Sequence, residues 1–405
     1  MRIKRSEILD ILIWLLFGFY TLIAHWIWFG RGIQETALLV LFAIQVIRRR
    51  SSVRINSSII SRILLAITGI YSIVVTLIGN DRTYLVADLK SILLSLFSLL
   101  YLYTFYKRKP EKCLAYIHKT CNCLMIYMWI NSLIILLQWK IPYFLMNRSA
   151  INSVGNLTYH DQLTGFIGIN GTTRWNILSC IIILYLLLNT NNGKDIAKTI
   201  IFIAISLLIS MINSARAFLI MMPLFVLFYY VVIKRKSIKI ILKYIGYVIL
   251  VLTAVFVLYR SNNFIREFID DLFYDKVRIY TTGDLAKMAR ANDDRAVAIN
   301  YAINQGGLYG KGIGSIPMHY SNVIVKYMGL NSASSFIYMI GIVGYFLYTF
   351  TLGNLSSMII NKKSFLISLG LSALWLIISF LLPVYSSAIL MMGTGLIIIL
   401  YAKQS

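Results

Sequence analysis

Residues 197–233 read AKTIIFIAISLLISMINSARAFLIMMPLFVLFYYVVI, and the charged residues of this stretch are Lys198 and Arg216 alone. About twenty consecutive apolar residues form a helix long enough to cross the hydrocarbon core of a bilayer. The stretch is therefore long enough for two such helices, and the polar residues near its middle mark a turn between them. We expect spans at 197–213 and 215–233, with Arg216 at the mouth of the pair.

The composition of the whole chain has the same character. Of its 405 residues, 59% are hydrophobic and 13% are charged, and the mean hydropathy is +0.76. A soluble domain carries about 25% charged residues, so soluble, disordered and fibrous proteins are excluded. A disulfide scaffold is also excluded. The four cysteines lie in or beside apolar runs, where we expect buried thiols; they are Cys113, Cys121, Cys123 and Cys180.

Ten further apolar runs predict ten more spans. The runs lie near 8–29, 33–47, 59–79, 84–106, 113–138, 173–189, 240–259, 334–352, 364–382 and 384–402. The first run is too long for the core of a signal peptide and no cleavage site follows it, so we expect it to be retained. The sequence predicts an all-α polytopic membrane protein with about 12 transmembrane helices, within a range of eleven to thirteen, in one integral domain over residues 1–405.

The basic residues predict how these spans are oriented. Lys and Arg number 39 against 15 Asp and Glu, and many of them cluster in alternate short connections, such as 48–54, 107–112 and 234–239. Short cytoplasmic loops are enriched in Lys and Arg, so both termini are expected in the cytoplasm. The excess charge then reflects membrane topology, and nucleic acid is not an expected partner.

Two connections on the predicted outer face are too long to be turns. They cover 139–172 and 260–333, and the second is a large extracytoplasmic loop in the C-terminal half of the chain. Long loops in compact proteins are usually functional. Within the large loop, residues 292–307 predict a short helix that starts near Arg295 and ends at Gly306.

A glycine string follows this helix, with glycines at 310, 312 and 314 around Lys311. Glycine lets a backbone turn sharply or approach a ligand closely, so the string is either a set of turns or a phosphate contact made by Lys311.

Arginines near the outer ends of spans are the strongest chemical signal. Arg216 has small neighbours that leave its side chain room to face inward, and Arg174 begins the span at 173–189. Both could instead anchor to lipid head groups. A guanidinium binds two phosphate oxygens at once, so converging arginines would suit a diphosphate. The four histidines are scattered, and we recognise no metal-binding, nucleotide-binding or serine-hydrolase motif. We therefore expect no metal and no cofactor.

Four short motifs in a fixed order resemble the superfamily of O-antigen ligases and Wzy-type polysaccharide polymerases. They are Asn213-Ser214-Ala215-Arg216-Ala217; Thr164-Gly165-Phe166-Ile167-Gly168 with Arg174; Arg295, ten residues and Gly306, followed by the glycine string; and Asn331-Ser332 followed by Gly341-Ile342-Val343-Gly344. Ligases of the family usually have His-Asn where this chain has Leu330-Asn331. That difference favours a capsular, exopolysaccharide or O-antigen repeat-unit polymerase, with a ligase as the alternative.

The resemblance implies a GT-C-like membrane glycosyltransferase in the bacterial cytoplasmic membrane. Such an enzyme transfers a growing glycan from undecaprenyl diphosphate to a lipid-linked acceptor at the outer face, with inversion and without metal. The implied partners are the lipid-linked donor and acceptor, the bilayer, and a chain-length regulator or flippase. A lipid-linked oligosaccharide flippase is the rival function, but it needs two related halves and we see no duplication in the sequence.

Negative charge grows on the diphosphate as the glycosidic bond breaks, and this assigns roles to individual residues. Arg216 and Arg295 are expected to stabilise that charge, supported by Arg174, Lys311 and Arg290. The base that activates the acceptor hydroxyl is left open among His319, His160 and Asp294. Tyr309 and Tyr320 either stack on sugar rings or pack within the loop.

Overall fold

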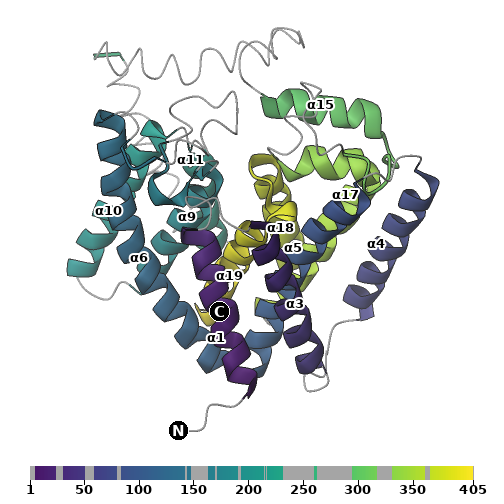
Figure 1. Cartoon of the computed structure of the whole chain (residues 1–405), viewed down its shortest axis with the longest axis horizontal. Coiled ribbons are helices and arrows are strands. Elements are labelled where there is room, and N and C mark those ends of the chain that lie inside the picture. The colour runs from purple at the N-terminus through teal and green to yellow at the C-terminus, as the bar shows by residue number, and fades with distance from the viewer. Residues whose placement is uncertain are drawn as a thin grey trace.

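The structure is a computed structural model. It describes residues 5–23, 31–50, 59–79, 84–141, 144–146, 163–168, 171–189, 193–213, 215, 217–230, 260–261, 294–316, 331–360 and 365–404. The regular elements in these ranges are all helical (Figure 1). The predicted all-α class is confirmed for this part of the chain.

Eleven of the twelve predicted spans contain a helix, and the twelfth, 240–259, lies outside the described residues. The helices are α1 (Arg5–Leu22), α3 (Arg31–Arg50), α4 (Ile59–Ile78), α5 (Leu85–Arg108), α6 (Pro110–Lys140), α9 (Thr172–Leu188), α10 (Gly193–Ile212), α11 (Ala217–Phe228), α17 (Ser332–Ile360), α18 (Phe365–Leu381) and α19 (Ala388–Gln404). The apolar runs form helices because a helix satisfies its own backbone hydrogen bonds where no water is present.

Within the described ranges, four helical segments are long and apolar enough to cross a membrane, and they lie in α5, α6, α10 and α17. Shorter apolar helices accompany them, including α9, α11, α18 and α19. The outward surface of α4 carries Ile70, Ile73 and Leu77, each at least 60% exposed. An apolar surface of this kind is stable in contact with lipid tails, and the chain is accordingly described as a membrane-embedded helical protein.

Contacts between helix ends show how the chain runs back and forth. At one end of the bundle, Glu7 of α1 accepts hydrogen bonds from Lys109 at 3.5 Å and Lys112 at 2.6 Å. At the ends of α9 and α19, Lys403 donates to Asn189 at 3.3 Å. Tyr185 of α9 also forms a hydrogen bond with His118 near the start of α6. This bond connects the α1–α6 contact to the α9–α19 contact. The start of α1 and the end of α19 therefore share one end of the bundle.

The opposite end carries α15 (Asp294–Gly306) and is called the α15 face below (Figure 1). Helix α17 is broken at Gly341, where φ is 70° and ψ is 176°. Its first part lies across the bundle beneath α15, and its second part descends through the bundle (Figure 1). The rings of Tyr301 and Tyr338 stack between the two layers with centroids 6.1 Å apart.

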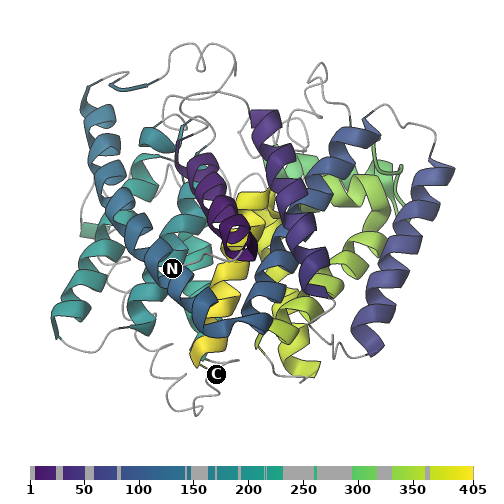
Figure 2. The ribbon, with the colours of Figure 1, turned by 60° about the horizontal axis from the view of Figure 1, so that its bottom comes forward.

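The core is centred on α19, which packs against α5, α9 and α17 (Figure 2). Its buried residues include Met391 and Tyr401, and the Tyr401 hydroxyl donates to the carbonyl oxygen of Phe225 at 2.8 Å. This bond satisfies a hydroxyl that would otherwise be costly to bury. It also holds α11 against the centre of the bundle.

A charged cluster is buried between α1, α3 and α5. Arg49 forms an ion pair with Asp10, and both side chains are about 5% exposed or less. Gln45 and Tyr101 donate to the same carboxylate oxygen at 3.0 and 3.1 Å. The guanidinium of Arg49 also lies over the ring of Phe105, at 4.6 Å from the centroid. From the sequence, the run of arginines that includes Arg49 was expected only to mark the cytoplasmic end of a span. Arg49 thus links three helices.

Candidate functional site

The short helix η1 (Gly165–Ile167) is held on the end of α6 by two polar side chains. Asn131 accepts from the amide of Phe166 at 2.8 Å and donates to the carbonyl of Thr164 at 3.2 Å. Gln138 accepts from the amide of Gly165 at 3.0 Å. These bonds replace the backbone partners that a regular helix would supply. They fix the segment that leads into α9.

Arg174 lies in the first turn of α9 and is 7% exposed. Its Nη1 donates to the carbonyl oxygen of Ile167 in η1 at 3.1 Å. A guanidinium that anchored a span to lipid head groups would be exposed at the rim of the helix. Arg174 is instead buried, and a carbonyl that α6 holds in place through η1 orients it.

The start of α11 lies beside the start of α9. The indole ring of Trp175 packs edge-on against Phe218, with ring centroids 5.4 Å apart. The turn before α11 is stabilised by Asn213, whose Oδ1 accepts from the amide of Ala215 at 3.1 Å. We call this region, from Arg174 and Trp175 to Asn213 and Phe218, the α9–α11 mouth.

Arg216 lies outside the described residues, but the residues on both sides of it belong to this mouth. Ala215 and Ala217 are 1% and 4% exposed. Ala215 and Ala217, the motif residues on either side of Arg216, therefore lie at the same mouth as Arg174.

Helix α15 begins at Asp294 and ends at Gly306, as the sequence predicted to within two residues. Arg295 and Asp294 are in its first turn, and the structure describes their backbone. The other end of α15 leads to the glycine string beside α4 and α17 (Figure 1). The first turn of α15 is therefore directed toward the middle of the α15 face.

The glycine string is built into the break of α17 by backbone contacts. The amides of Lys311 and Gly312 donate to the carbonyls of Tyr338 and Met339 at 2.9 and 2.8 Å. A Cβ on Gly310 would collide with the Met339 carbonyl. The glycines of the string thus allow close approach of two backbones, which was neither of the two alternatives that the sequence left open, a set of turns or a phosphate contact.

The other side of the string is held by α4 and α5. The amide of Ile313 donates to Thr76 at 3.1 Å, and the amide of Gly314 donates to the Asp88 carboxylate at 3.1 Å. The amide of Tyr84 returns a bond to the Gly314 carbonyl at 3.2 Å. The string thus ties the end of α4 and the start of α5 to α17.

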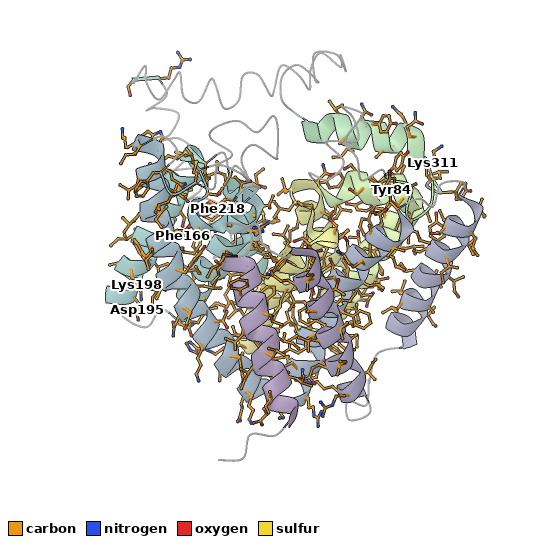
Figure 3. The ribbon with its side chains drawn as sticks, in the orientation of Figure 1. Tyr84, Phe166, Asp195, Lys198, Phe218 and Lys311 are labelled. Carbon is orange, nitrogen blue, oxygen red and sulfur yellow. The ribbon has the colours of Figure 1, made fainter. Side chains whose placement is uncertain are left out.

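Two predicted substrate-binding residues lie in this string, on the opposite side of the molecule from the α9–α11 mouth. The side chain of Lys311 is exposed, and Tyr309 is 67% exposed. Figure 3 shows Lys311 and Tyr84 on one side and Phe166 and Phe218 on the other. From Arg295 to Gly306, α15 rises about 17 Å, so the structure does not bring Lys311 to Arg295.

The remaining predicted site residues lie outside the described part of the chain. They are His160, Arg290, His319 and Tyr320. Within the part that is described, no group of three His, Cys, Asp or Glu side chains is placed to hold a metal ion.

Asn331 caps α17. Its Oδ1 accepts from the amide of Ser334 at 2.8 Å, and its side chain is fully buried. The next residue, Ser332, accepts from the amide of Tyr385 at 2.7 Å and so ties the start of α17 to η3 (Val384–Ser386). The motif Asn331-Ser332 thus has a structural role in fixing where α17 begins.

Asn131 and Gln138 are positioning residues that the sequence analysis did not single out. Each is a polar amide in a long apolar run, and such residues within membrane spans are rare and face the protein interior. That signal was present in residues 113–138. Their partner in η1 could not be identified, because it lies more than 25 residues away in sequence. No family model matches the chain, and a search of curated proteins finds no match.

Proposed function

We propose that this chain is a membrane glycosyltransferase that polymerises lipid-diphosphate-linked oligosaccharide repeat units. In this proposal the α15 face is the outer face of a bacterial cytoplasmic membrane. The bundle has about twelve spans in a GT-C-like arrangement, and both termini are cytoplasmic. The substrate is an undecaprenyl-diphosphate-linked glycan, which acts as donor and as acceptor.

The observation that carries the proposal is the burial of Arg174 at the α9–α11 mouth. Arg174 donates to the Ile167 carbonyl, and its burial holds a permanent positive charge beside the starts of α9 and α11. The starts of α9 and α11 lie together there, and each helix start carries partial positive charge. A diphosphate is an anion that this combination of a guanidinium and two helix starts would stabilise.

The proposed chemistry needs positive charge where the glycosidic bond breaks. Electrons move onto the bridging oxygen of the departing diphosphate while the acceptor hydroxyl attacks the anomeric carbon from the opposite side. Ala215 and Ala217, the sequence neighbours of Arg216, lie at the mouth, and the first turn of α15, which contains Arg295, is directed to the same face. We assign Arg216 and Arg295 to the diphosphate. The hydroxyl proton passes to a base among His319, His160 and Asp294.

The direct test uses the purified full chain in detergent or nanodiscs, supplied with a lipid-linked repeat unit. A ladder of longer lipid-linked glycans is expected from the wild-type protein. Arg216→Ala and Arg295→Ala should each lower the rate by about a hundredfold or more, the usual effect of removing a preorganised charge stabiliser. Arg216→Lys should recover little activity, because lysine lacks the planar fork.

A matched control is Lys198→Ala, which removes an exposed cation near the start of α10, away from the α15 face (Figure 3). This variant should make the wild-type ladder. Full activity in both arginine variants would remove the assigned roles. If the lipid-linked glycans kept their length and moved between leaflets, the proposed function would be wrong and the chain would be a flippase.

A further inference from the structure

Two buried N–H donors at the α9–α11 mouth have no acceptor in the structure. They are Nε1 of Trp175 and Nδ2 of Asn213, in side chains that are 0% exposed. An orphaned buried donor is costly, and buried polar groups are paired in the great majority of cases. Both donors lie near the starts of α9 and α11, where they are available to a bound acceptor.

Both groups can only donate. An indole N–H has no lone pair to offer. The amide of Asn213 is oriented by its own cap, because Oδ1 accepts from the amide of Ala215 at 3.1 Å, which leaves Nδ2 as the free end. A partner of these two groups must therefore accept hydrogen bonds.

The surroundings favour an anion over a neutral acceptor. The starts of α9 and α11 point into the mouth, the indole is held there by its contact with Phe218, and the buried Arg174 directly precedes Trp175. Phosphate oxygens also accept hydrogen bonds from neutral N–H groups, and such bonds are stronger than those between two neutral groups because the acceptor is charged.

We infer that Trp175 and Asn213 form a phosphate subsite at the α9–α11 mouth and donate to the lipid-borne diphosphate. The inference rests on the proposed function and adds two uncharged residues to it. Their role is to fix the position of the phosphate, while the arginines supply charge.

Two variants remove one donor each: Asn213→Asp is isosteric, and Trp175→Phe keeps an aromatic ring of smaller volume. Trp175→Phe loses the N–H but retains a ring against Phe218. Asn213→Asp retains an acceptor for the Ala215 amide and places negative charge where the phosphate would lie. The control is Trp14→Phe, because Trp14 also has a buried indole N–H without a partner, but in α1, where its ring lies 6.0 Å from that of Tyr116.

Binding is measured on the full chain by native mass spectrometry, with undecaprenyl diphosphate, inorganic pyrophosphate and undecaprenol as separate probes. Trp175→Phe and Asn213→Asp should each weaken binding of undecaprenyl diphosphate by about tenfold or more, as expected for a bond to a charged acceptor. Trp14→Phe should stay within about twofold of wild type, since its donor lies elsewhere. The affinity for pyrophosphate should fall in the same variants, and the affinity for undecaprenol should be the same in all four proteins.

Wild-type binding in both mouth variants would mean that internal water satisfies these donors, and it would overturn the inference even if the polymer ladder is made. A wild-type protein that makes no ladder, while the mouth variants lose diphosphate binding, would support the subsite and overturn the polymerase. If the mouth variants weakened binding of undecaprenol as much as binding of undecaprenyl diphosphate, the site would recognise the lipid tail, and the phosphate assignment would be overturned. If Asn213→Asp lowers the unfolding temperature strongly, Trp175→Phe decides alone.

Discussion

Gly341 and Leu308 meet backbone to backbone at the break in α17, and a Cβ on Gly341 would collide with the Leu308 carbonyl oxygen. The amide of Val343, two residues further on, donates to that same carbonyl at 3.2 Å. The break is therefore closed by the loop that leaves α15. Because α15 and the first part of α17 are joined here, the position of α15 over α17 depends on this contact.

We predict that Gly341→Ala destabilises the protein by about 2 kcal/mol or more. The substitution places a side chain at φ 70°, which costs about 1–3 kcal/mol by itself, and the collision with Leu308 adds to it. Thermal unfolding of the purified protein in detergent measures the effect. The matched control is Gly69→Ala in α4, where a Cβ meets nothing within 4 Å. That variant should be as stable as wild type or slightly more so, and an equal loss in both variants would contradict the prediction.

Asn131→Leu should detach η1 from α6. The substitution removes the bonds to Phe166 and Thr164, and leaving these buried backbone groups unpaired costs about 1–3 kcal/mol each. Arg174 takes its orientation from Ile167 in η1. The rate of glycan transfer should therefore fall by more than the loss of folded protein alone would explain. Unfolding temperature and ladder formation are measured together, with the exposed Asn304→Leu as the control. Loss of stability with full activity would show that η1 does not position Arg174.

The pair Asp10 and Arg49 predicts strong coupling in a double-mutant cycle. Removing one partner leaves a buried charge alone, so Arg49→Met and Asp10→Leu should each cost about 3–5 kcal/mol. The double variant should cost much less than their sum, because neither charge remains. Unfolding in denaturant measures all four proteins. Additive losses would show that the two side chains do not interact.

Asn331 offers a test that separates capping from substrate contact. Asn331→Ala should cost about 1 kcal/mol through loss of the N-cap, whereas Asn331→Asp keeps an acceptor for the Ser334 amide and so retains the cap. The Nδ2 of Asn331 is a further buried donor without a partner in the structure. If it serves only the fold, Asn331→Asp should form the ladder at the wild-type rate. A stable but inactive Asn331→Asp would instead place this donor on the substrate.

Much of the helical framework was predictable from residue order alone. Eleven predicted spans contain helices, and the predicted start and end of α15 are correct to within two residues. These predictions succeed because an apolar run in a membrane must satisfy its backbone internally, and because caps and glycine stops act over a few residues. The break in α17 was missed, since the run at 334–352 contains no charged residue and Gly341 takes its conformation from its contact with Leu308, which is far away in sequence.

The side chains of the candidate site also divide into features that the sequence predicted and features that only the tertiary structure shows. Composition and the apolar runs determined that this is a membrane-embedded helical protein, and they placed Arg174 near the start of a span. Only the tertiary structure decided that Arg174 is buried, because its carbonyl partner is held by Asn131 and Gln138 of another helix. The tertiary structure also placed Lys311 away from the α9–α11 mouth. Which helices pack together depends on side-chain contacts across the whole bundle, and these contacts join residues that no local pattern connects.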